Sequence, residues 1–334
     1  MISRRRFAAI TALAASAMSS AASAAERAGG ELRTDRLQSA HVPGEVAVGV
    51  YLPPGYGATP DKRYPLLLLL HGGDGSERDL ARFAPVIDRA VRDGRIPPLV
   101  VATPSARRSL YMDYRDGSER WETFVVSELL AHLRAAFAVS LERKHTFVGG
   151  WSMGGLGSLR LAFKHPDLFA AVAALEPAVE PVLSWQAIGP RVKFWRSDEI
   201  YQHIFGAPVD TAFWAANNPA TIAQRDPRRL IDLGVYLDVG DQDLLYLNHG
   251  VEFLHRVLFD AGVAHEYRLV QGGEHVGPSL SPRLYDALGF IGRRIDPPAW
   301  IDGTVLAARR VMDEKKRAAG LPVEVVDPRR IRGS

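Results

Sequence analysis

The 334-residue chain is predicted to fold as an α/β protein with a mainly parallel, twisted sheet and helices on both faces. Two observations support this prediction. Short apolar runs alternate along the chain with segments of helical periodicity, and the strongest run, residues 66–70, consists of leucine alone. A continuous apolar run of this length is typical of a strand buried on both faces of a sheet. Strands that alternate with helices indicate parallel βαβ units.

Each predicted strand is a short apolar run bounded by glycine, proline or polar residues. In chain order these strands are residues 46–52, 64–70, 99–102, 146–148, 170–175, 235–239 and 267–270. Each predicted helix repeats apolar residues at intervals of three and four. These helices are residues 78–91, 121–137, 153–164, 250–261, 282–294 and 301–319. In sheets of this kind, ligands bind beyond the carboxyl ends of the strands, so we expect the functional residues there.

Two segments depart from the alternation. Residues 176–229 lack strong periodicity and contain three tryptophans, so we expect them to form a small lid or pocket wall over the sheet. Residues 296–334 begin with Asp296-Pro297-Pro298 and are polar, which predicts a C-terminal extension with a surface helix and a loose end. The expected organisation is therefore one domain over residues 25–295, followed by this extension.

Composition excludes several classes of protein. The chain has no cysteine, which excludes a disulfide scaffold, a cysteine zinc site and a thiol nucleophile. The longest unbroken aliphatic run, residues 66–70, is far shorter than the roughly 18 apolar residues of a membrane span, so no stable membrane span is expected.

The first 24 residues have the pattern of an export signal. Arg4, Arg5 and Arg6 resemble a twin-arginine motif, an alanine-rich stretch follows, and Ala22-Ser23-Ala24 fits a cleavage site. We therefore expect a periplasmic or secreted protein. Removal of these three arginines leaves 38 of the 41 basic residues. This number equals the 38 acidic residues, so the remaining chain is neutral. A neutral chain lacks the electrostatic basis for nucleic-acid binding, and no nucleic-acid partner is expected.

The candidate nucleophile is Ser152, in Gly150-Trp151-Ser152-Met153-Gly154. Gly-x-Ser-x-Gly between a strand and a helix predicts a strained turn that exposes the serine hydroxyl. The following helix N-terminus places backbone N–H groups beside a developing oxyanion. We therefore expect the N–H of Met153 to be one oxyanion donor. The loop His71-Gly72-Gly73-Asp74, directly after a buried strand, resembles the loop that supplies the other oxyanion donor in hydrolases with such a serine turn. We therefore expect the N–H of Gly73 as the second donor, with Asp74 next in line and His71 bracing the loop.

A serine nucleophile needs a base and an acid that orients the base. Six histidines follow Ser152: His165, His203, His249, His255, His265 and His275. His275 is preferred because it lies in a loop after the last predicted strand. Asp238, Asp241 and Asp243 compete for the role of the acid, since all three lie at or after the strand 235–239. We select Asp243 with Asp241 as the second candidate, and we expect the one that is not catalytic to cap the next helix.

Three tryptophans, Trp151, Trp185 and Trp214, are candidates for an apolar wall of the substrate pocket, although tryptophan more often serves packing. Arg115 and Asp116 lie in a loop that fits either the pocket mouth or the plain surface. The bound ester is expected to be a small molecule or a carbohydrate-linked ester. Neither its acyl nor its alcohol part can be read from these residues, and nothing in them indicates an oligomeric state.

Over residues 40–295 the chain resembles the esterase D-like branch of α/β-hydrolases, which includes S-formylglutathione hydrolases, feruloyl and acetyl xylan esterases, enterochelin esterases and mycolyltransferases. The resemblance rests on motifs at residues 50–56, 70–73, 121–124, 150–155, 238–243 and 272–275. In the last of them, many members have the histidine directly after the glycines, whereas here Glu274 intervenes. The resemblance implies an α/β-hydrolase fold without metal or organic cofactor. It also supports Ser152, Asp243 and His275 as the triad.

The expected function is hydrolysis of a carboxylic ester through an acyl-enzyme. Three alternatives stay open. One is acyl transfer to a sugar or lipid alcohol, which would use the same triad. Another is a thioesterase of the S-formylglutathione type, which the export signal disfavours because that substrate is cytosolic. The third is a binding protein on the same scaffold, which an intact Ser, Asp and His in the right order disfavours.

Overall fold

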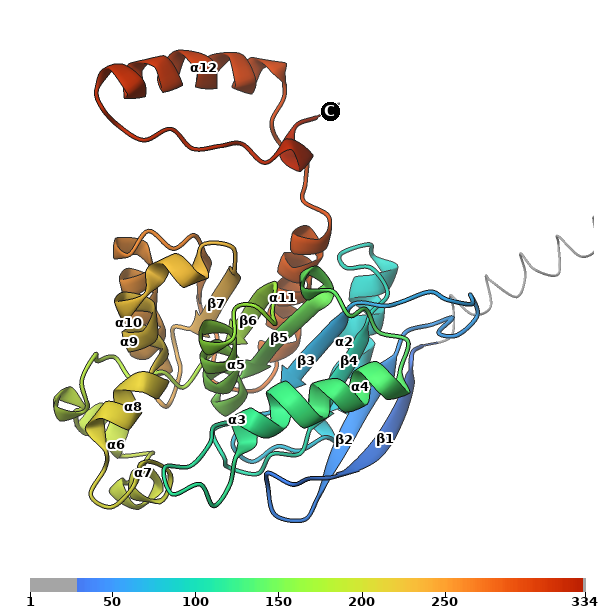
Figure 1. Cartoon of the computed structure of the whole chain (residues 1–334), viewed down its shortest axis with the longest axis vertical. Coiled ribbons are helices and arrows are strands. Elements are labelled where there is room, and N and C mark those ends of the chain that lie inside the picture. The colour runs from blue at the N-terminus through green and yellow to red at the C-terminus, as the bar shows by residue number, and fades with distance from the viewer. Residues whose placement is uncertain (1–28, 333–334) are drawn as a thin grey trace, which may run out of the picture.

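The computed structural model of the chain describes residues 29–332, so the predicted export signal lies outside the described residues. An eight-stranded sheet forms its centre, in the order β1-β2-β4-β3-β5-β6-β7-β8 (Figure 1). The strands are β1 (Glu31–Gln38), β2 (Glu45–Leu52), β3 (Leu66–Leu70), β4 (Val100–Pro104), β5 (Thr146–Trp151), β6 (Ala171–Leu175), β7 (Gly234–Gly240) and β8 (Glu266–Val270). The pairs β1–β2 and β2–β4 are antiparallel, and all other pairs are parallel.

The leucine run of β3 shows why the sheet is covered on both faces. Leu66, Leu68 and Leu70 belong to one hydrophobic core, and Leu67 and Leu69 belong to the other. Successive side chains of a strand point to opposite faces, so a strand of leucine alone requires an apolar layer on each side. This arrangement confirms the predicted α/β class with helices on both faces.

The helices divide between these two cores. One core includes side chains of α2 (Asp79–Arg92) and α11 (Leu280–Ile295), which pack against each other. The other core includes side chains of α4 (Leu130–Ala136), α5 (Met153–Lys164) and α10 (Leu247–Asp260). The helix predicted at residues 121–137 forms with a local widening, because α3 (Trp121–Thr123) and α4 are joined by a π-helical turn, Phe124–Leu129.

Strand β1 was not expected from the sequence. Its residues, ELRTDRLQ, are mostly charged or polar, and none of them is buried. As an edge strand it pairs along its whole length with β2, from Glu31 opposite Leu52 to Gln38 opposite Glu45. Backbone pairing and polar side-chain contacts, such as that of Asp35 with His132, hold it there, and Leu37 packs partly against one core. The strand therefore lacks the apolar alternation that reveals a half-buried strand.

Residues 176–229 fold into four short helices beside the carboxyl ends of the strands. These are α6 (Pro190–Lys193), α7 (Asp198–Phe205), α8 (Thr211–Asn217) and α9 (Pro219–Arg225). We call this segment the cap. Its helices are too short to show a clear period in the sequence, which explains why only its place, and not its helices, was expected.

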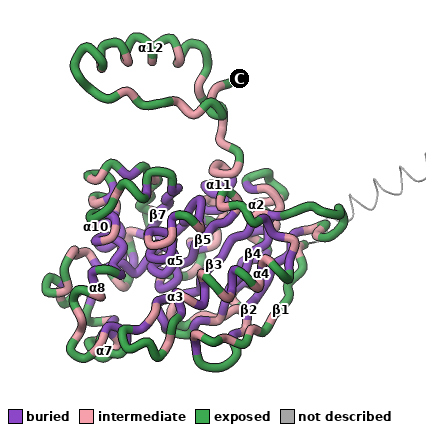
Figure 2. The backbone as a smooth tube through the Cα atoms, viewed as in Figure 1, coloured by how far each residue is buried: buried purple, intermediate pink, exposed green. Residues whose placement is uncertain are grey.

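Residues 296–332 leave the body of the protein after α11, and α12 (Gly303–Ala318) stands apart from the sheet (Figure 1). None of the residues of α12 is buried, as Figure 2 shows. The expectation of a loose end is wrong in part, because Ile331 returns to form a bridge with Ile301. Within residues 29–332, no helix has the length and hydrophobicity that crossing a bilayer requires.

Candidate active site

The candidate nucleophile lies on the turn between β5 and α5. Ser152 has φ 55° and ψ −118°, a conformation that side chains rarely adopt and that stores strain. The flanking glycine Gly150 is required by packing, because a Cβ atom there would lie 2.5 Å from the carbonyl oxygen of Leu70. The Gly-x-Ser-x-Gly pattern therefore meets two physical needs at once: a strained turn and a close approach of β3.

The structure joins three of the sequence candidates in one hydrogen-bonded chain. The Ser152 Oγ lies 3.1 Å from Nε2 of His275, and Nδ1 of the same ring lies 2.9 Å from Oδ2 of Asp243. Asp243 and His275 are both buried. Each of the three residues follows a strand of the sheet, namely β5, β7 and β8. The parallel strands thus bring together residues that are up to 123 positions apart in the chain.

Asp243 has a second contact that fixes its orientation. Its Oδ1 accepts hydrogen bonds from the backbone N–H of Leu245 at 2.8 Å and of Leu247, the first residue of α10, at 3.2 Å. One carboxylate oxygen therefore faces the imidazole while the other is held by the backbone before α10. An aspartate held in this way presents a fixed acceptor to His275.

The electrostatic environment favours the charged form of His275. Burial alone would lower the pKa of this imidazole, but the hydrogen bond to Asp243 and the nearby charge of Glu176 outweigh it. The net effect is a pKa above the ordinary value of histidine. A base of this kind holds a proton that it takes from a serine hydroxyl more readily than free imidazole does.

The two other acids have different contacts. Asp241 accepts a hydrogen bond from the N–H of Gly272 at 2.7 Å and thereby ties the loop after β7 to the loop after β8. The expectation that the acid without contact to His275 caps the next helix is wrong. Asp241 bonds to Gly272, and Asp243 is the acid that accepts a hydrogen bond from the first residue of α10. Asp238 is fully buried in β7, where Arg283 donates to its Oδ1 and Tyr236 to its Oδ2.

The loop after β3 faces the serine. His71 is fully buried, and its Nε2 accepts from the N–H of Ala106 at 2.9 Å while its Nδ1 lies 2.7 Å from the carbonyl of Gly72. It therefore braces this loop. Within residues 29–332 the N–H groups of Gly73 and Met153 donate to no protein acceptor, and both residues line the cavity around Ser152. These two amides are thus free to bind a substrate oxygen.

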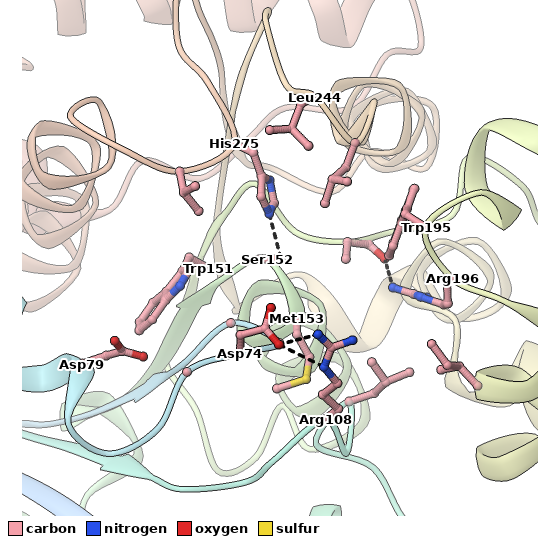
Figure 3. A pocket seen from close by; sticks show the side chains of 18 residues that line it. Asp74, Asp79, Arg108, Trp151, Ser152, Met153, Trp195, Arg196, Leu244 and His275 are labelled. Carbon is pink, nitrogen blue, oxygen red and sulfur yellow. Dashed lines mark hydrogen bonds and ion pairs between the residues drawn. The ribbon is translucent and has the colours of Figure 1, made fainter.

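A cavity of about 520 Å³ opens above Ser152 (Figure 3). Trp151 lines it as expected, together with Trp195 of the cap, which the sequence reasoning did not select. The expectation for Trp185 and Trp214 is wrong, since neither lines the cavity. Their rings pack edge to face, with centroids 6.2 Å apart, and Trp214 is fully buried inside the cap. Composition marks the cap as aromatic, but packing alone decides which ring faces the cavity.

The loop with Arg115 and Asp116 lies away from this cavity. Arg115 forms an ion pair with Asp210 at 2.7 Å, and its backbone N–H donates to the carbonyl of Ile204. Asp116 accepts from Ser118 within its own turn. Of the two readings that the sequence left open, the surface loop is therefore the right one, and this loop supports the cap.

One buried acid near the candidate triad was not expected from the sequence. Glu176 directly follows β6, the strand between the serine strand and the aspartate strand, and its side chain is fully buried. The position directly after a parallel strand was the signal that the sequence offered. Among the described residues, the one group of acidic and histidine side chains close enough to hold a metal ion is Glu176, Asp243 and His275. Two of its members are hydrogen-bonded to each other.

Comparison with known proteins agrees with this geometry. A family model named Esterase, described as "Putative esterase", matches residues 39–285. An esterase of Mycobacterium tuberculosis (strain ATCC 25618 / H37Rv) is 28% identical over 263 residues, which make up 73% of this chain and 56% of that protein. An acetyl esterase of Caldicellulosiruptor saccharolyticus is 34% identical over 113 residues, 34% of this chain and 41% of that protein. The chain spans about half the length of the curated relatives that it matches.

Solved structures show the same fold. A ferulic acid esterase superposes with a TM-score of 0.66 at 27% identity and covers 80% of this chain and 99% of its own. The S-formylglutathione hydrolase from Agrobacterium tumefaciens superposes with a TM-score of 0.66 at 20% identity and covers 80% of this chain and 96% of its own. The fold is therefore that of the α/β-hydrolases, as the sequence resemblance implied.

Proposed function

Because the chain belongs to the Esterase family, in the esterase D-like branch of the α/β-hydrolases, we propose that it is a serine esterase that hydrolyses a carboxylic ester through an acyl-enzyme. The observation that carries this proposal is the hydrogen-bonded chain from Ser152 through His275 to Asp243 at the carboxyl edge of the sheet. A serine that contacts a buried imidazole oriented by a carboxylate has the geometry required for nucleophilic catalysis.

In the proposed mechanism, the Ser152 Oγ attacks the ester carbonyl carbon while His275 Nε2 takes its proton. Asp243 holds the Nδ1–H of the ring and stabilises the imidazolium. The N–H groups of Gly73 and Met153 bind the oxyanion of the tetrahedral intermediate. His275 then returns its proton to the leaving alcohol. In the second half-reaction the same imidazole takes a proton from water, whose oxygen attacks the acyl carbon. The bond from this carbon to the Ser152 Oγ then breaks, His275 returns the proton to Oγ, and the acid is released.

We propose an ester with an extended alcohol part, such as an acylated carbohydrate, as the substrate. A second cavity of about 690 Å³ shares Trp195 and Leu245 with the cavity above Ser152. The two cavities together offer room for more than a short acyl group and a small alcohol. The likeness to a ferulic acid esterase and to an acetyl esterase supports this class of ester.

Labelling with a fluorophosphonate, followed by an ester panel, tests the proposed function. The purified protein should be labelled at Ser152. It should hydrolyse p-nitrophenyl acetate, methyl ferulate and acetylated sugars, each at a different rate. Folded protein that neither reacts with the probe nor turns over any ester contradicts the proposal. Formation of a new ester when a sugar or lipid alcohol is added would replace hydrolysis with acyl transfer as the reaction.

We further propose that residues 1–24 direct export by the twin-arginine route to the periplasm or the exterior. The arginine triplet, the alanine-rich stretch and the Ala-Ser-Ala site support this proposal. Changing Arg4 and Arg5 together to lysine should retain the full-length chain in the cytoplasm, whereas the unchanged precursor should be cut after Ala24. Cell fractionation with mass spectrometry of the N-terminus measures both results, and a stable full-length chain in the cytoplasm contradicts export.

A further inference from the structure

A second carboxylate lies beside the imidazole of the candidate triad. One side-chain oxygen each of Glu176 and Asp243 and one ring nitrogen of His275 all lie within 4.8 Å of one another. Glu176 is fully buried. Its Oε2 accepts from Arg283 at 2.6 Å, but its Oε1 is buried and has no hydrogen-bond partner among the described residues. A buried carboxylate oxygen without a partner is costly and needs an explanation.

The backbone of Glu176 has an unfavourable conformation. Glu176 has φ +41°, in the left-handed region that residues with a Cβ atom rarely occupy. Its N–H donates to the carbonyl of Asp238 at 2.7 Å, and two residues later the N–H of Ala178 donates to the carbonyl of Ser152 at 3.1 Å. The segment after β6 is therefore tied both to β7 and to the nucleophile turn, which keeps the carboxylate directed at the site despite the strain.

The charges around Glu176 do not balance. Within residues 29–332, Arg283 from α11 is the one cation that forms an ion pair with Glu176, and it also pairs with Asp238. Asp243 adds a further negative charge from the loop after β7. Two carboxylates, those of Glu176 and Asp243, thus lie beside the imidazole, while the guanidinium of Arg283 is shared between Glu176 and Asp238, so the excess negative charge near His275 favours its protonated form. Burial, opposed by Arg283 and His275, raises the pKa of Glu176 to about 7, so its charge varies near neutral pH.

We propose that Glu176 is a positioning residue that acts through His275: its buried carboxylate stabilises the imidazolium together with Asp243 and so sets the pH at which the base is available. No bond to Glu176 forms or breaks. When His275 takes the proton of Ser152, the positive charge on its ring arises beside two carboxylates, those of Glu176 and Asp243, and not beside Asp243 alone. This inference rests on the proposed function only for its kinetic consequences, because the titration of His275 does not depend on ester turnover.

Two isosteric substitutions separate this role from a structural one. Glu176→Gln removes the charge that faces His275, and Asp238→Asn removes the other carboxylate that pairs with Arg283. Asp238 is therefore a matched control, since its loss disturbs the same arginine without removing a member of the cluster around the imidazole. The pH profile of kcat/KM and the NMR titration of the His275 ring, the latter in a Ser152→Ala background, are measured for each variant.

In Glu176→Gln the midpoint of the His275 titration and the acid limb of kcat/KM should both move to lower pH by at least about half a unit, because the imidazolium loses one carboxylate. We expect kcat at the plateau to fall about five- to tenfold with KM nearly unchanged. Glu176→Asp, which keeps the charge but holds it farther from the ring, should have a midpoint between that of Glu176→Gln and that of the unchanged protein. Asp238→Asn should lower the melting temperature and leave the midpoint in place.

Equal shifts in Glu176→Gln and Asp238→Asn would show that Glu176 acts only by holding Arg283, and would overturn the proposal. An unchanged titration in folded Glu176→Gln would also overturn it. If Glu176→Gln does not fold, the comparison of Glu176→Asp with the unchanged protein decides, because moving the carboxylate away from the ring must still lower the midpoint measurably. If the protein hydrolyses no ester at all, the proposed function fails while the NMR titration still tests the role of Glu176.

Discussion

The carboxyl edge of the sheet and the cap differ in how their residues reach the site. At the sheet edge, Ser152, Asp243 and His275 each follow a parallel strand, so their place is set by the sheet itself. In the cap, Trp195 reaches the cavity from a segment of short helices, while Trp185 and Trp214 pack inside that segment. We infer that the reaction depends on the sheet edge, which has a regular geometry, whereas the choice of substrate depends on the cap.

The largest effect is expected from the nucleophile. Ser152→Ala should reduce turnover of an activated ester by at least about a thousandfold, because the covalent route is lost. Thermal melts should change little, since the turn is made by its glycines. Ser158→Ala, in the helix α5 that follows this turn, serves as the control, because it removes a buried hydroxyl whose one hydrogen bond within residues 29–332 is to the carbonyl of Gly155. Turnover near the original level in Ser152→Ala would remove this serine from the mechanism.

The two acids after β7 give the next comparison. Asp243→Asn should lower kcat by about a hundredfold or more, because an amide neither stabilises imidazolium nor fixes the ring tautomer. Asp241→Asn should change kcat by less than about threefold, since an amide oxygen can still accept from the N–H of Gly272. Paired kinetics on one activated ester measure both. A mild effect in Asp243→Asn beside a large one in Asp241→Asn would exchange their roles.

The pH dependence of kcat/KM tests the environment of His275. Its pKa is raised, so the protonated ring, which cannot act as a base, persists to a higher pH than for free histidine. Activity should therefore be complete only above this raised pKa and should fall about tenfold per pH unit below it. Asp241→Asn should show the same profile. A rate that stays constant down to pH 5 would contradict the assignment of His275 as the base.

Substitutions in the cap should leave kcat nearly unchanged, and two tryptophans there should respond differently. Trp195→Ala should raise KM about tenfold for bulky esters with little change in kcat, because it removes a cavity wall. Trp214→Ala should instead lower the free energy of unfolding by about 3–5 kcal/mol, because this ring is fully buried. Denaturant titration and ester selectivity distinguish them. A loss of ester selectivity in Trp214→Ala without a loss of stability would contradict the assignment of Trp195 to the cavity wall and of Trp214 to the interior of the cap.

The fold and the candidate site could be predicted from the sequence to different depths. The parallel strands and the loops that carry Ser152, Asp243 and His275 were predictable, since apolar runs and glycine-rich turns are local patterns. Strand β1 was not, because an exposed edge strand carries no apolar alternation. Glu176 was not selected either, because a lone glutamate after a strand has no motif. Its importance arises only from the neighbours that the fold gives it.

By itself, the sequence determined the α/β class, the strained turn at Ser152 and the order of the three candidate triad residues, because each depends on the chemistry of a few consecutive residues. Only the tertiary structure decided that Trp195 and not Trp214 faces the cavity, that Asp243 contacts both His275 and the start of α10, and that Glu176 lies beside the same imidazole. These contacts join residues from separate strands and helices. Distances between them depend on how the sheet and the cap pack, which local patterns do not encode.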